Sequence, residues 1–103
     1  MKEALNESYP AFEWDPEKAR RNIKKHGIDF MEASYVFADR LNITIHDSAH
    51  SGRENRWVTI GKVSEKIIIV VHTYPNEPSE SPIRIISARL AKSSEIRYYQ
   101  EGE

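Results

Sequence analysis

The spacing of apolar residues changes along this chain, from a helical period in its first third to a strand period afterwards. Residues 12–14 alternate between apolar and polar, as in a short strand. Asp15-Pro16-Glu17 then offers an N-cap, a proline at the first helical position and an acid in the first turn, and Gly27 offers a stop. We therefore predict a helix that ends at about His26. A second helix follows Asp29, with a capping box and an apolar stripe at Phe30, Ala33, Val36 and Phe37.

From residue 41 onward, apolar and polar residues alternate with a period of two. This pattern predicts four strands, at Leu41–His46, 54–62, Lys66–Thr73 and Ile83–Ala88. A short helix from about Ser93 to Gln100 is predicted to close the chain. The run Ile67–Val71 is apolar on both faces, which is typical of a central strand. Prolines make Tyr74–Pro82 a loop. The order β-α-α-β-β-β-β-α predicts an α+β fold, a mostly antiparallel sheet with helices packed on one face and the other face open.

The length and composition fit one small globular domain. The chain has 103 residues, 39% hydrophobic and 30% charged. We expect residues 1–11 to be a flexible leader and residues 12–100 to form the domain. The absence of cysteine excludes disulfide scaffolds, zinc-thiolate sites and cysteine nucleophiles. Because no apolar run reaches 18 residues and no signal segment is present, we expect a cytoplasmic protein without a membrane segment.

Charge and motifs narrow the possible ligands. The net charge is −1, but acidic residues concentrate at both ends and in the Pro-rich loop, which leaves a mildly basic body. Such a body can offer a phosphate-binding face, although an ordinary solvated surface has the same composition. No glycine-rich nucleotide motif is present, so we expect no cofactor. His46 and His50 are separated by a predicted turn, and we expect no metal site there.

A few titratable residues could support cleavage of a phosphodiester. Glu54 and Arg56 project from the same side of a predicted strand, and His72 ends the central strand. Phosphodiester cleavage needs a base, an acid and fixed cations, and arginine suits the last role because it binds phosphate with two N–H groups. Arg84 and Arg89 flank the last strand at opposite parities, so both can face one site only if the strand ends or bulges between them. Glu54 and Arg56 could equally form a surface ion pair.

Several strings in this order resemble the BrnT family. They are Phe12-Glu13-Trp14-Asp15-Pro16, Lys25-His26-Gly27, Asp47-x-x-His50-Ser51-x-x-Glu54-x-Arg56-Trp57, Val70-Val71-His72-Thr73 and Arg84-Ile85-Ile86-Ser87-Ala88-Arg89. The resemblance runs from about Phe12 to Tyr99. Two positions depart from the family pattern: Arg40 follows Asp39 where proline is usual, and Lys92 stands where a threonine N-cap is expected.

The resemblance implies a ribonuclease toxin of a type II toxin–antitoxin system with a RelE-like fold. It further implies metal-independent RNA cleavage by attack of the ribose 2′-hydroxyl, and a BrnA-type ribbon-helix-helix antitoxin that alone contacts operator DNA. Glu54 or His72 would be the general base, with the other or His26 as acid. The remaining roles are phosphate binding by Arg56, Arg84 and Arg89, and steering of the RNA backbone by Lys25, beside His26.

Two other functions fit the same residues. The chain could be a catalytically inactive module that only titrates an antitoxin, since no residue spacing is unmistakably catalytic. It could also bind nucleic acid directly through the basic first helix, which would give steeply salt-dependent binding without cleavage.

Overall fold

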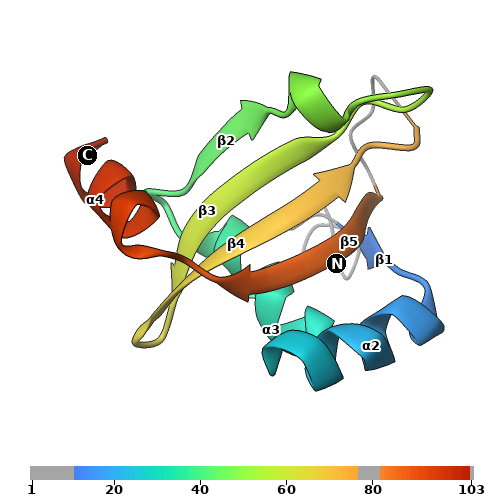
Figure 1. Cartoon of the computed structure of the whole chain (residues 1–103), viewed down its shortest axis with the longest axis horizontal. Helices are drawn as coiled ribbons and strands as arrows, with labels where there is room; N and C mark the ends of the chain where they lie inside the picture. Colours follow the sequence, from blue (N-terminus) through green and yellow to red (C-terminus); the bar gives the residue numbers. More distant parts are fainter. Residues whose placement is uncertain (1–10, 77–81, 103) are drawn as a thin grey trace, which may run out of the picture.

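The computed structural model describes residues 11–76 and 82–102, and its elements follow the predicted order. Most of the predicted leader and residues 77–81 of the predicted loop lie outside this range. Figure 1 shows the elements, which are β1 (Phe12–Glu13), α2 (Pro16–His26), α3 (Phe30–Ser34), the 3₁₀ helix η1 (Tyr35–Ala38), β2 (Ile43–His46), the 3₁₀ turn η2 (Ser48–His50), β3 (Trp57–Val63), β4 (Lys66–Thr73), β5 (Ile83–Leu90) and α4 (Ser93–Glu101).

Both predicted helix starts are confirmed by their caps. The Asp15 carboxylate accepts a hydrogen bond of 2.9 Å from the amide of Glu17, and that of Asp29 accepts one of 2.9 Å from the amide of Met31. Gly27 ends α2 in the left-handed region, with φ 73°, and its amide bonds the carbonyl of Ile23. The second helix is shorter than its apolar stripe suggested, because the chain tightens into η1 after Ser34.

The sheet has five strands in the order β1-β5-β4-β3-β2, with β4 in the centre as predicted. β1 pairs with β5 in parallel and the other neighbours are antiparallel, so the sheet is mixed. β2 is an edge strand and is more exposed than its alternation predicted. Ile45 keeps 43% of its surface exposed.

The main core lies between one face of the sheet and the two N-terminal helices. The core consists of Ile28, Phe30, Ala33, Val36, Ile68, Val70, Ile85 and Ala88. Gly61 of β3 is needed for this packing, because a Cβ atom there would lie 2.7 Å from the Cβ of Val36. α2 and α3 therefore cover this first face of the sheet.

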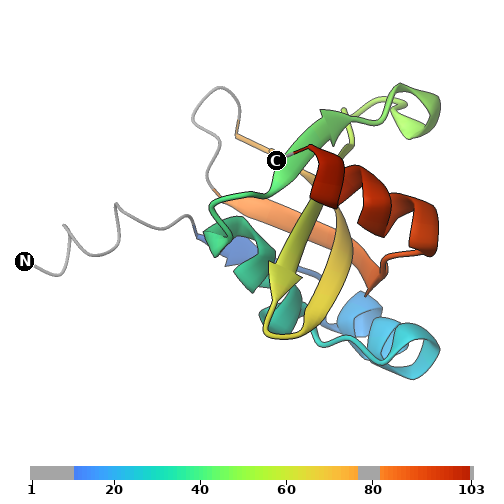
Figure 2. The ribbon, with the colours of Figure 1, turned by 90° about the vertical axis from the view of Figure 1, so that its left-hand side faces the viewer.

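The prediction that all helices pack on one face is wrong for α4. Tyr99 of α4 is buried against Ile60 and Ile69, which belong to a second cluster and alternate along β3 and β4 with residues of the first face. Figures 1 and 2 show α4 packed on the sheet apart from α2 and α3. The Tyr99 hydroxyl also donates a 2.5 Å hydrogen bond to Asp39. Apolar side chains on the second face of the sheet need a cover, and α4 supplies it at one end. Among residues 11–76 and 82–102, no helix or strand covers the other end of this face, which we call the open face.

Candidate active site

A β-bulge in β5 brings two predicted site residues to the same face of the sheet. Val71 pairs with Ser87, whereas the next residue of β4, His72, pairs with Ile85. Ile86 is thus an extra residue in β5, and beyond it the side chains change parity. Ile85 and Ala88 accordingly both enter the core, although they are three residues apart. Arg84 and Arg89 then both lie on the open face, which is the condition that the sequence required.

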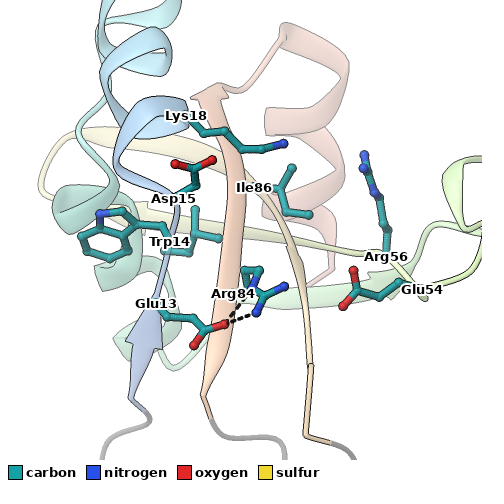
Figure 3. A pocket seen from close by; sticks show the side chains of 9 residues that line it. Glu13, Trp14, Asp15, Lys18, Glu54, Arg56, Arg84 and Ile86 are labelled. Atoms are coloured by element: carbon teal, nitrogen blue, oxygen red, sulfur yellow. Dashed lines mark hydrogen bonds and ion pairs between the residues drawn. The ribbon is translucent and has the colours of Figure 1, made fainter.

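The open face carries two adjoining hollows. The first, of about 530 Å³, is lined mainly by charged side chains from β1, α2, β5 and the loop before β3. These are Glu13, Asp15, Lys18, Glu54, Arg56 and Arg84. Figure 3 shows Lys18 extending from α2 over the hollow, toward the side from which Arg56 enters. Arg84 forms an ion pair with Glu13 of the adjacent strand. The Nε atom and one terminal nitrogen of Arg84 each lie 2.6 Å from Oε2 of Glu13.

Glu54 and Arg56 enter the first hollow from a loop, and their prediction as part of a strand over 54–62 is wrong because β3 begins only at Trp57. The Arg56 amide donates to the Ser51 hydroxyl at 2.9 Å, and the Arg56 carbonyl accepts from the Asp47 amide at 2.9 Å. The ion pair between Glu54 and Arg56, which the sequence left as an alternative, is not formed. Within residues 11–76 and 82–102, neither side chain has an ion pair or hydrogen bond. Both groups are therefore available to a ligand.

The second hollow, of about 710 Å³, also contains Arg56 and continues along the sheet to α4. Its floor is apolar, with Ile45, Val58 and Val71 side by side in neighbouring strands. Its rim is polar or aromatic and is formed by His46, Asp47, His50, Ser94, Glu95, Tyr98 and Arg89. Arg56 lines both hollows, so they adjoin on the open face, and we call the two together the groove.

Arg89 is occupied within the protein. Its two terminal nitrogens bond the two carboxylate oxygens of Glu95 at 2.9 and 2.8 Å. This two-point hydrogen bond, together with one from the amide of Lys92, lowers the pKa of Glu95 to about 2 despite its partial burial. Lys92 is the N-cap of α4, and its amide donates to the Glu95 carboxylate, so the helix begins without a threonine cap.

His72 lies on the other face of the sheet and lines neither hollow. It is fully buried, its Nε2 lies 2.8 Å from the hydroxyl of Thr59, and its ring contacts those of Phe37 and Tyr74. Burial lowers the pKa of His72 to about 4. The structure therefore separates His72 from Glu54 and the arginines, and gives its side chain a packing environment.

Lys25 and His26 also lie apart from the hollows, in the last turn of α2. With 11 residues, α2 is about 16 Å long, and its opposite end supplies Lys18 to the first hollow. Sequence reasoning did not propose Lys18, Asp47 or Tyr98 as site residues. Lys18 and Tyr98 reach the hollows because α2 and α4 pack against the sheet, and Asp47 does so from the turn after β2.

The part of the chain that the structure describes contains no group of three or more His, Asp and Glu side chains placed to hold a metal ion. His50 Nδ1 instead lies 3.0 Å from an Asp47 oxygen, and His46 Nε2 lies 3.1 Å from the Asn55 side-chain oxygen. None of the helices described is long and apolar enough to cross a membrane.

The fold and the groove define a class of protein: a small α+β domain whose open sheet face presents basic side chains and Glu54, a carboxylate without a partner among the described residues. Comparison with known families makes this more specific. The profile of the ribonuclease toxin BrnT, of type II toxin–antitoxin systems, matches residues 14–95. The chain belongs to this family. No curated protein matches it. Family membership supports endonuclease activity on RNA and implies an antitoxin partner.

Proposed function

We propose that this toxin cleaves RNA without a metal ion, in the groove on the open face of the sheet. The observation that carries the proposal is the bulge at Ile86, which places Arg84 and Arg89 on the same face as Arg56. Phosphodiester cleavage creates negative charge on the phosphoryl oxygens, and fixed guanidinium groups stabilise that charge.

The first hollow is the proposed reaction centre. Glu54 would accept the proton of the ribose 2′-hydroxyl, and the oxygen would then attack the neighbouring phosphorus. Arg56 and Lys18 would bind the phosphate, with Lys18 giving a proton to the leaving 5′ oxygen. The products are a 2′,3′-cyclic phosphate and a 5′-hydroxyl. Arg84 and Arg89 would only line the groove in this step, because Glu13 and Glu95 balance their charges.

His72, Lys25 and His26 receive other roles in this proposal. His72 would support the packing beneath the sheet, because its ring is buried on the far side from the groove. Lys25 and His26 would attract the RNA backbone at a distance from the reaction, since they lie at the far end of α2 from Lys18.

The proposed partner is a BrnA-type ribbon-helix-helix antitoxin, and the proposed location is the cytoplasm. The antitoxin would neutralise the ribonuclease and would make the contacts with operator DNA. Expression of the toxin alone is then expected to arrest growth, and co-expression of the antitoxin to restore it.

The test is cleavage of an end-labelled RNA by the purified protein in EDTA, with Glu54→Gln and Arg56→Gln beside it. We expect cleavage by the wild type and a loss of about 100-fold or more in each variant. Arg97→Gln is the matched control, because Arg97 is exposed on α4 and lines neither hollow. Cleavage that requires added Mg²⁺, or products with a free 3′-hydroxyl, would contradict the proposed chemistry. A folded wild type that neither cleaves RNA nor arrests growth would support the inactive module.

A further inference from the structure

The second hollow differs from the first in the chemistry of its lining. Ile45, Val58 and Val71 form an apolar floor across three neighbouring strands, and Ile45 keeps 43% of its surface exposed. Two carboxylates, of Asp47 and Glu95, stand at its rim. An apolar floor beside carboxylates is unsuited to a phosphate group. It suits a flat, uncharged group that carries hydrogen-bond donors.

We propose that the second hollow is a nucleobase subsite that favours guanine, on the assumption that the first hollow is the reaction centre proposed above. Arg56 lines both hollows, so a phosphate bound at Arg56 has its attached nucleoside at the entrance to the second hollow. The occupant is therefore the base next to the cleaved bond. It lies over Val58 and Val71, between α4 and the loop that contains Asp47.

Tyr98 supplies the stacking surface of the subsite. It lies on α4 at the rim of the hollow, and 49% of its surface is exposed. Aromatic side chains bind unpaired bases by stacking, with little dependence on the identity of the base. Tyr98 therefore contributes affinity for any base, and another group must provide the choice among bases.

Asp47 supplies that choice. Its carboxylate has about four acceptor positions, and His50 Nδ1 is the single donor that contacts it within the described residues. Both oxygens of Glu95, in contrast, are engaged by Arg89. Guanine presents two adjacent donors, N1–H and the exocyclic amine, which one carboxylate can accept together. Adenine and cytosine present only an amine on the same edge, and uracil presents a single ring N–H. The expected preference is guanine first and uracil last.

The experiment measures binding separately from cleavage. A set of trinucleotides that differ only in the base to be tested, each with 2′-deoxyribose at the scissile position, cannot be cleaved by 2′-hydroxyl attack. Their dissociation constants are measured by calorimetry with the wild type, Asp47→Asn, Tyr98→Ala and Tyr98→Phe. Asp47→Asn leaves the main-chain bonds of Asp47 in place, including the one that positions Arg56.

The expected results differ between the two residues. Asp47→Asn reduces the preference for guanine over uracil by about tenfold. Tyr98→Ala weakens binding of every trinucleotide by about fivefold or more, and Tyr98→Phe binds as the wild type does. Tyr35→Ala is the control, since Tyr35 is 52% exposed but lines neither hollow.

Failure of this inference and failure of the proposed function give different results. Metal-free cleavage with a base preference unchanged in Asp47→Asn would overturn the subsite and leave the ribonuclease reaction intact. Binding that prefers guanine and depends on Tyr98, in a protein that does not cleave RNA, would support the subsite and overturn the reaction. If the Asp47 and Tyr98 variants lose affinity for the antitoxin and keep their affinity for every trinucleotide, the hollow belongs to the antitoxin and the subsite is overturned.

Discussion

The side-chain amide of Asn22 is hydrogen-bonded to the main chain of Ala88 in the way that a neighbouring strand would be. Asn22 Nδ2 donates to the Ala88 carbonyl at 2.9 Å, and the Ala88 amide donates to Asn22 Oδ1 at 3.1 Å. Nδ2 also donates to the carbonyl of Ile28 at 2.9 Å. β1 pairs only with Ile83 and Arg84, so Asn22 occupies the outer edge of β5 beyond the end of β1. This contact holds α2 along β5 and thereby places Lys18 at the first hollow.

Asn22→Asp should destabilise the protein by about 2–4 kcal/mol. The substitution preserves the shape of the side chain, but the buried carboxylate would face two carbonyl oxygens with no hydrogen to donate. The free energy of unfolding in urea measures the effect. Asn55→Asp serves as the control at an exposed position, where we expect a change within about 0.5 kcal/mol. Equal stability of the two variants would show that the contact to Ala88 contributes little.

Stability should fall as the pH is lowered through the window set by His72. Burial lowers the pKa of folded His72 to about 4, whereas the ordinary value is 6.5. Between these values the unfolded chain binds more protons than the folded chain, so folding becomes less favourable as the pH falls from 6.5 to 4. Over the whole window the loss reaches about 3 kcal/mol.

Urea unfolding at several pH values between 7 and 4 measures this dependence. His72→Gln should remove most of the slope, whereas His50→Gln should keep it, since the side chain of His50 is 72% exposed. A slope that persists in His72→Gln would assign the titration to other groups. His72→Gln should also retain RNA cleavage in proportion to the folded fraction, because His72 lies on the far side of the sheet from the groove.

The parts of the fold that depend on neighbouring residues could be predicted from the sequence. The caps at Asp15 and Asp29 and the stop at Gly27 each use atoms within a few residues, so their spacing is sufficient. The central position of β4 followed from its apolar run. The face covered by α4 did not follow, because the residues opposite it, Ile60 and Ile69, are distant in the sequence.

The candidate site could be predicted only in part for the same reason. The sequence showed that Arg84 and Arg89 need a bulge to share a face, but the bulge itself arises from the pairing of β5 with β4. His72 alternates like its neighbours, and its burial depends on Phe37, which comes from η1. Lys18 becomes a site residue only when α2 is packed along β5.

Tyr99 and Asp39 should contribute to stability as a coupled pair that holds α4 on the sheet. The Asp39 carboxylate accepts hydrogen bonds from the Tyr99 hydroxyl and from the amides of Leu41 and Lys62. Burial raises the pKa of Asp39, but these hydrogen bonds lower it by more, so the net pKa lies below 3.8. The contribution is therefore present above about pH 4 and is lost as the pH falls through the lower folded pKa.

Tyr99→Phe should cost about 1.5–3 kcal/mol, the usual worth of a hydrogen bond to a charged group. In a protein that already carries Asp39→Ala, the same change should cost much less, and a double-mutant cycle in urea measures the difference. Tyr98→Phe on the same helix should change stability by less than about 0.5 kcal/mol. Additive effects of the Tyr99 and Asp39 substitutions would argue against the coupling.

Glu95→Gln should increase the affinity of the groove for RNA. In the wild type, Glu95 neutralises Arg89 through both carboxylate oxygens. The substitution removes one negative charge from the second hollow and leaves the Arg89 guanidinium with a neutral neighbour, so Arg89 can contact a phosphate. One additional phosphate contact makes the slope of log K against log salt steeper by about 1.

The measurement uses an RNA with 2′-O-methyl groups throughout, which cannot be cleaved by 2′-hydroxyl attack, at several salt concentrations. Glu101→Gln controls for the loss of one acidic charge on α4 outside both hollows. If both variants change affinity equally with an unchanged slope, the effect is one of total charge, and Arg89 does not meet the RNA backbone.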